Sequence, residues 1–232
     1  MPRRPPVSPR RRCRPRAVSL TLVLLTLVSP LAPPLPGVVP ALSPARAEII
    51  TSSSTAESSR RAVWQRVFER VPAALRPRRD VLVREISDQE MDDLVAEDAE
   101  QAARQDDDDS IVDGIFLYDD EGRPTITLRR SLSPADAPLV FAHELGHLVW
   151  DTHLTAGERG RFTAAYKQSK NAKRLVTDYA GESAEEGWAE AFSFFVLKPD
   201  TLRSRDPRAF DILRQMCGGK VPGPQPPAAP KR

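Results

Sequence analysis

All three histidines of this 232-residue chain lie within eleven residues, at positions 143, 147 and 153. On a helix, residues four apart share one face about 6 Å apart along the axis, so His143 and His147 can bind one metal ion. Glu144, the next residue round the helix, can then point its carboxylate at a metal-bound water. The same five-residue pattern also occurs by chance on helices that bind no metal.

The residues around this pattern favour a metal site over chance. Apolar residues surround it on nearly every side of the expected helix: Leu139, Val140, Phe141, Ala142, Leu145, Leu148, Val149 and Trp150. Such a helix is buried, and burying two imidazoles and a carboxylate without partners costs several kcal/mol. We therefore expect Zn²⁺ to be bound by His143 and His147.

One candidate for the third ligand is His153. It follows His147 by six residues, as in metalloproteases with the pattern HExxHxxGxxH. In that pattern a glycine lets the chain turn back to the metal. Here Trp150 takes its place, and a bulky residue is poorly suited to the positive φ of such a turn. His153 is therefore the weaker candidate.

The other candidate is Glu186, on a second expected helix. Glu182, Glu186 and Glu190 lie four residues apart and would share one face of it. Three stacked carboxylates repel one another unless a cation faces them. A zinc ion held by Glu186, with Glu190 accepting a hydrogen bond from the far nitrogen of a ligand histidine, would satisfy the stack. A solvated acidic face is the alternative, but neighbours such as Trp188 favour burial, and so we prefer Glu186 as the ligand.

These residues resemble the gluzincin catalytic domain of the anthrax lethal factor type, which also includes the secreted Pro-Pro endopeptidases. The resemblance rests on two short segments, His143–His147 and Glu186–Phe192, and on Tyr179, seven residues before Glu186. It covers roughly residues 62–216 in element order. The large companion domains of lethal factor have no room in this chain, which argues against a toxin role.

The resemblance implies a role for each matched residue. His143, His147 and Glu186 bind zinc, Glu144 is the general base, and Tyr179 stabilises the oxyanion. The chain is then an exported zinc-dependent endopeptidase that hydrolyses peptide bonds with a zinc-bound water activated by the glutamate. Two alternatives stay open. One is a catalytically silent, zinc-stabilised secreted binding protein, and the other is a metzincin-like protease with His153 as third ligand.

The elements that must position these residues indicate an α+β, zincin-like fold. Cap signals at Ser133 and Asp136 predict that the HExxH helix runs through about Asp151. A small mixed sheet is expected to pack on this helix, beside the second, Glu-bearing helix. Val81–Ile86 has the pattern of a strand, and Ser87 with Glu90 forms a capping box for a following helix.

A β-hairpin is expected just before the active-site helix. Its strands are Ile111–Asp119 and Pro124–Arg129, joined by a turn at Asp120–Gly122. The second strand, within Thr125–Arg129, is a candidate edge against which an extended substrate could pair. An ordinary internal strand is an equal alternative.

The distribution of charge divides the chain into parts. Residues 1–47 hold eight arginines, no acidic residue, and an apolar run of 12 residues, the layout of a secretory signal cleaved after Ala47. That run is too short for a membrane anchor. Residues 48–232 carry 26 basic and 32 acidic residues, a net charge of −6. We expect a flexible tether at 48–61, a metallopeptidase domain at 62–217, a Pro-rich disordered tail at 218–232, and a secreted or periplasmic location.

Other clusters are interpreted as solvent-exposed. The basic residues Lys167, Lys170, Lys173 and Arg174 form no nucleic-acid patch in so acidic a domain. Asp106–Asp109 lacks the alternation and the glycine of an EF-hand, which favours a loop over a calcium site. We expect Cys217 to be pendant or intermolecular, with a latent thiolate ligand for zinc as the alternative. A peptide or protein substrate is the expected partner.

Overall fold

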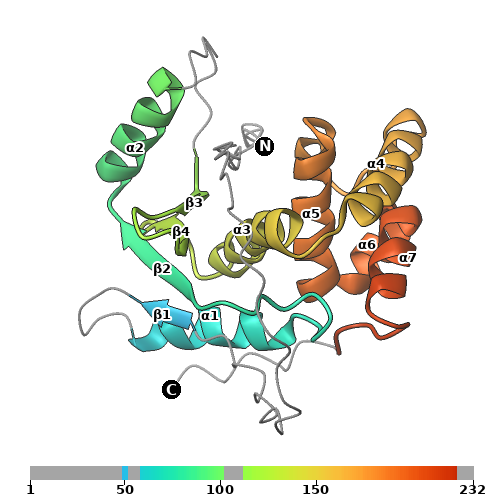
Figure 1. Cartoon of the computed structure of the whole chain (residues 1–232), viewed down its shortest axis with the longest axis horizontal. Helices are drawn as coiled ribbons and strands as arrows, with labels where there is room; N and C mark the ends of the chain where they lie inside the picture. Colours follow the sequence, from blue (N-terminus) through green and yellow to red (C-terminus); the bar gives the residue numbers. More distant parts are fainter. Residues whose placement is uncertain (1–48, 52–57, 102–111, 224–232) are drawn as a thin grey trace, which may run out of the picture.

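The computed structural model describes residues 49–51, 58–101 and 112–223 (Figure 1). The proposed export signal at 1–47 and the acidic run Asp106–Asp109 lie outside these residues. Within the described part of the chain, no helix combines the length and the apolarity needed to cross a membrane. The elements in chain order are β1 (Ile49–Thr51), α1 (Ser58–Arg70), β2 (Val81–Ile86), α2 (Asp88–Gln101), β3 (Gly114–Tyr118), β4 (Pro124–Arg129), α3 (Ala137–Thr152), α4 (Ala156–Asn171), the 3₁₀ helix η2 (Tyr179–Gly181), α5 (Ala184–Leu197), α6 (Pro199–Arg205) and α7 (Pro207–Met216).

The four strands form one mixed sheet in the order β1-β2-β4-β3. β1 and β4 both run parallel to β2, whereas β3 and β4 form an antiparallel hairpin whose turn includes Gly122 at φ +72°. Positive φ suits glycine because it has no Cβ. The Ser87–Glu90 capping box is also present, with Ser87 Oγ accepting from the Glu90 amide. The α+β class with a small mixed sheet is therefore confirmed.

Of the two alternatives for Thr125–Arg129, the structure shows the ordinary internal strand and not the sheet edge. β4 pairs with β2 on one side and β3 on the other, and all six of its residues are buried. The sequence did not exclude this, because the alternation of side chains along Thr125–Arg129 does not show how many strands pair with it. Among the described strands, β3 is the free edge beside α3.

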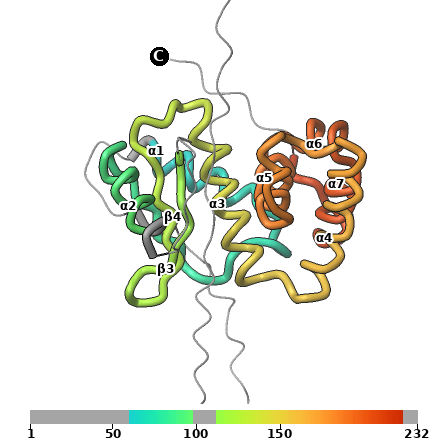
Figure 2. The backbone as a smooth tube through the Cα atoms, turned by 90° about the horizontal axis from the view of Figure 1, so that it is seen from above, coloured from blue at the N-terminus to red at the C-terminus, as the bar shows by residue number. Residues whose placement is uncertain are grey.

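Helix α3 lies between the sheet and a group of helices formed by α4 to α7 (Figures 1 and 2). In Figure 2 the sheet lies to its left and α5 to its right. This central position explains the apolar composition of α3, because both of its long sides are covered. Its residues share one hydrophobic core with α1, the sheet, α4 and α5, in which Trp64, Phe141 and Trp188 are among the largest buried side chains.

The contact between α3 and α5 is close because a glycine lies at the crossing. A Cβ placed on Gly146 would lie 2.8 Å from the Ala189 Cα and 3.3 Å from its carbonyl oxygen. Trp188 Nε1 donates to the Gly146 carbonyl oxygen at 2.9 Å, in the same contact. Backbone therefore meets backbone where the two helices that carry the predicted ligands cross.

We expect Gly146→Ala to destabilise the fold by about 1–3 kcal/mol, because the helices must separate to admit the methyl group. Gly160→Ala on α4 is the matched control. Nothing lies within 4 Å of its added Cβ, so the change is expected to be neutral or to stabilise by up to about 1 kcal/mol. Urea unfolding of both variants measures the effect. Equal midpoints would show that the α3–α5 contact tolerates a side chain.

Both ends of the expected domain extend further than the sequence indicated. Part of the predicted tether is ordered, because β1 pairs with β2 and α1 begins at Ser58. At the other end, Arg70 donates to the Val196 and Gly223 carbonyl oxygens, so the first residues of the predicted tail pack against α1. The tail from residue 224 onward lies outside the described residues.

Cys217 follows α7 directly and is buried in the core, so the expectation of a pendant or intermolecular cysteine is wrong. Burial raises the pKa of its thiol to about 11. It lines a cavity together with Val71 and Pro72, which follow α1. A protonated thiol enclosed in this way is a small apolar side chain of the core and not a metal ligand.

Candidate metal centre

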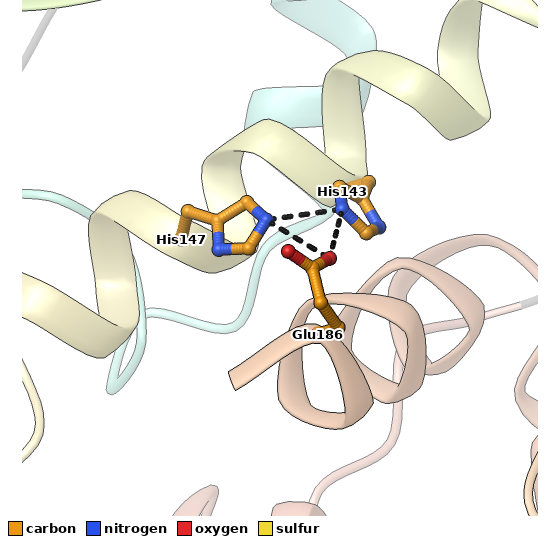
Figure 3. A group of neighbouring side chains, drawn as sticks. All are labelled: His143, His147 and Glu186. Atoms are coloured by element: carbon orange, nitrogen blue, oxygen red, sulfur yellow. Dashed lines mark hydrogen bonds and ion pairs between the residues drawn. The ribbon is translucent and has the colours of Figure 1, made fainter. Parts of the chain in front are cut away.

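His143 and His147 lie one turn apart on α3, and both side chains are fully buried. Their rings face α5 (Figure 3), and the two Nε2 atoms are 3.0 Å apart. Glu186 approaches from the first turn of α5, where Ser183 Oγ caps the helix by accepting from the Glu186 amide. Its Oε2 lies 3.2 Å from His143 Nε2 and 3.5 Å from His147 Nε2. Three ligand atoms from two helices thus converge on one point.

The three side chains fit a metal ion of the zinc type. Ligand atoms about 2.0–2.1 Å from a tetrahedral zinc lie about 3.3 Å from one another, which matches the observed 3.0, 3.2 and 3.5 Å. Two imidazoles and one carboxylate also form a common ligand set of catalytic zinc sites. The buried Oε2 of Glu186 accepts no well-formed hydrogen bond. These three residues could therefore hold a metal ion, and they are the group that the described residues offer for it.

The centre favours positive charge. Burial alone lowers the pKa of His147, but the nearby carboxylates of Glu185 and Glu186 outweigh it and raise this pKa to about 10. Burial likewise lowers the pKa of His143, and the neighbouring carboxylates of Glu186 and Glu190 raise it overall. For Glu186, burial raises the pKa, but the two histidines lower it to about 2. The carboxylates therefore favour a positive charge, either a proton or a metal ion, at the point where these groups meet.

Glu190 lies one turn beyond Glu186 on α5, where the sequence predicts it. Its Oε1 is 2.9 Å from His143 Nδ1. With Nδ1 as the donor, the lone pair of Nε2 faces the centre, which is the tautomer that a metal ligand requires. The other carboxylate oxygen, Oε2, accepts a hydrogen bond of 2.6 Å from Thr177 Oγ1. Sequence reasoning missed Thr177, because a single threonine in a loop carries no motif.

A second carboxylate lies behind His147, although less closely. Glu185 Oε1 is 3.8 Å from His147 Nδ1, too far for a hydrogen bond, and the Glu185 side chain is partly exposed. His147 Nδ1 is buried without a hydrogen-bond partner. Sequence reasoning also missed Glu185, because its neighbour Glu186 is the one that continues the four-residue spacing to Glu190.

The two predicted catalytic residues have different neighbours. Glu144 is fully buried on the side of α3 that faces the sheet, and a Cβ on Gly114 of β3 would lie 3.2 Å from its Cγ. Tyr179 belongs to η2, is half-buried, and has its ring centroid 5.8 Å from that of His143. The structure thus places Glu144 between α3 and the sheet, and Tyr179 beside the ring of His143.

His153, the alternative third ligand, lies apart from the site. His153 caps α3 and lines a cavity of about 270 Å³ together with Pro77, Arg78 and Pro124. The helix continues through Trp150, so six further residues rotate His153 about 240° from His147, to another side of α3. Burial and the charge of Arg78 lower the pKa of His153.

The expectation that Glu182, Glu186 and Glu190 share one helix face is wrong for Glu182. Glu182 caps η2 and is exposed. Ser183 starts α5 in extended conformation, so the helical spacing begins only after Glu182. The acidic face of α5 therefore consists of Glu186 and Glu190, both buried.

Comparison with protein families and with curated proteins finds no match at a significant level. What the chain does chemically must therefore be argued from the side chains that α3, η2 and α5 bring together.

Proposed function

We propose that this protein is an exported zinc-dependent endopeptidase with a zincin-like, gluzincin-type catalytic domain. One observation carries the proposal: the buried convergence of His143, His147 and Glu186, with Glu144 beside it on the same helix. A zinc ion that only stabilises a fold is commonly enclosed by four protein ligands, whereas three leave a position for reactants. The layout of residues 1–47, an arginine-rich segment followed by an apolar run of 12 residues, supports export.

A metal ion held here supplies Lewis acidity and lowers the pKa of a coordinated water. Glu144 takes the proton of the attacking water and later transfers it to the leaving amine, so that the water oxygen ends on the new carboxylate. Its burial beside β3 suits this role, because a carboxylate in a water-poor site interacts strongly with a nearby proton.

Tyr179 and β3 fit the remaining tasks of a peptidase. The Tyr179 hydroxyl donates to the oxyanion that develops on the peptide carbonyl, an effect worth ~10²–10³ in rate. β3 offers its free edge beside Glu144, and an extended peptide can add to such an edge through main-chain hydrogen bonds. An extended peptide or protein segment is therefore the proposed substrate.

The proposal is tested by incubating the purified full chain, loaded with one equivalent of Zn²⁺, with a diverse peptide library. We expect new termini in mass spectra, loss of cleavage on chelation, and recovery when zinc is restored. A chain that binds zinc but cleaves nothing would contradict the proposal and favour the silent binding protein. Cleavage that survives chelation would indicate a contaminating protease.

A further inference from the structure

A hydrogen-bond chain connects the metal centre to the segment that carries Tyr179. It starts at His143 Nδ1, which is 2.9 Å from Glu190 Oε1. Thr177 Oγ1 donates to Glu190 Oε2 at 2.6 Å and accepts from the Ala180 amide at 3.1 Å. The chain thus crosses from α3 to α5 and then to η2, three elements that are distant in the sequence.

The hydroxyl of Thr177 takes the place of a helix cap. Asp178 is the N-cap of η2 by position, but its side chain makes no capping hydrogen bond. Thr177 accepts the Ala180 amide instead, in the local pattern that serine and threonine side chains often form. Its hydroxyl has one proton, which it donates to Glu190, so a single group fixes both the carboxylate behind His143 and the start of η2.

The far end of η2 is fixed by α4. Tyr166 Oη donates to the Gly181 carbonyl oxygen at 3.0 Å, and Lys170 Nζ donates to the same oxygen at 2.6 Å. Tyr179 therefore lies between two anchors, one at Thr177 and one at Gly181. The anchor at Gly181 holds η2 to α4, whereas the anchor at Thr177 holds it to the metal centre.

We propose that Thr177 is a positioning residue that couples the orientation of His143 to that of Tyr179. The expected effect on kcat rests on the proposed function. The expected effect on zinc affinity rests on the metal site alone. Without the hydroxyl, Glu190 loses a hydrogen bond that orients it, and the Ala180 amide loses its acceptor. Metal affinity and transition-state stabilisation are then both expected to fall.

Thr177→Val keeps the shape of the side chain and removes the hydroxyl, whereas Thr177→Ser keeps the hydroxyl. Loss of a group that orients a metal ligand typically costs about 10–100-fold in affinity. We expect Thr177→Val to bind Zn²⁺ at least about 10-fold more weakly in competition with a chromophoric chelator. Thr177→Ser should bind like the wild type. Thr163→Val, a half-buried threonine on α4, is the matched control and should also bind like the wild type.

The kinetic test separates positioning from loss of metal. At saturating zinc, Thr177→Val is expected to lower kcat and leave KM unchanged, because Tyr179 acts on the transition state. In the Tyr179→Phe background the same substitution should lower kcat much less, since the hydroxyl that it positions is gone. Thermal unfolding of the metal-free variants checks that the core is intact.

Equal zinc affinity and equal kcat for Thr177→Val and the wild type would overturn the inference, as would Thr177→Ser behaving like Thr177→Val. An active wild type with an unaffected Thr177→Val leaves the peptidase proposal standing and removes the role of Thr177. A wild type that binds zinc without cleaving peptides removes the peptidase proposal, while the difference in zinc affinity still supports the coupling of Thr177 to His143.

Discussion

Glu144→Gln is expected to lower kcat for peptide hydrolysis by ~10²–10⁴ and to leave zinc content unchanged. The amide has nearly the same shape as the carboxylate but cannot take a proton from water. Zinc content is expected to persist because the three side chains that converge on the metal position are His143, His147 and Glu186. Steady-state kinetics on a peptide identified from the library, with zinc measured in the same samples, gives both quantities.

Glu182→Gln is the matched control for this experiment. It makes the same chemical change at an exposed carboxylate just before α5, and we expect kcat to stay at the wild-type value. Undiminished kcat in Glu144→Gln, with full zinc occupancy, would contradict the role of Glu144 as general base. A chain that loses zinc on this substitution would instead make Glu144 part of the ligand set.

Glu186→Ala is expected to empty the metal site, whereas His153→Ala should leave it full. Glu186 Oε2 lies within 3.5 Å of both ligand nitrogens, while His153 lines a separate cavity with Arg78. The loss of affinity should exceed the ~10–100-fold caused by losing a residue that only orients a ligand. Metal content after dialysis against trace zinc measures it directly.

The same pair of variants tests how much the metal stabilises the fold. A ligand present at about 1,000 times its Kd stabilises the native state by ~4 kcal/mol. We expect zinc to raise the melting temperature of the wild type and of His153→Ala, and not that of Glu186→Ala. Zinc retained in Glu186→Ala but lost from His153→Ala would show that the third ligand and the gluzincin resemblance are both misassigned.

Features that depend on neighbours in the sequence were predictable. The spacing of His143 and His147 places them on one face of any helix, and the apolar residues around them require that helix to be buried. β2, the hairpin of β3 and β4, and the Ser87–Glu90 capping box also follow from local patterns, and the structure confirms them. The period of a helix or strand is a local property, so the residues themselves carry it.

Features that depend on contacts between distant segments were not predictable in the same way. β4 is internal because β2, about forty residues earlier in the sequence, pairs with it. The residues of β4 do not indicate this pairing. Arg129 is a similar case, since it is buried and binds Asp92 and the Asp88 carbonyl oxygen of α2. The choice of partner is made by packing, which the alternation of a single strand does not encode.

The candidate site combines both kinds of information. The sequence by itself determined that two histidines and a glutamate share a buried helix, and it supplied Glu186 and Glu190 at the correct spacing on another. Only the tertiary structure decided that these helices cross at Gly146, which brings Glu186 between the two imidazoles. It alone excluded Glu182 and placed Thr177 behind Glu190. Helical period fixes which side chains share a face, whereas long-range packing fixes which faces meet.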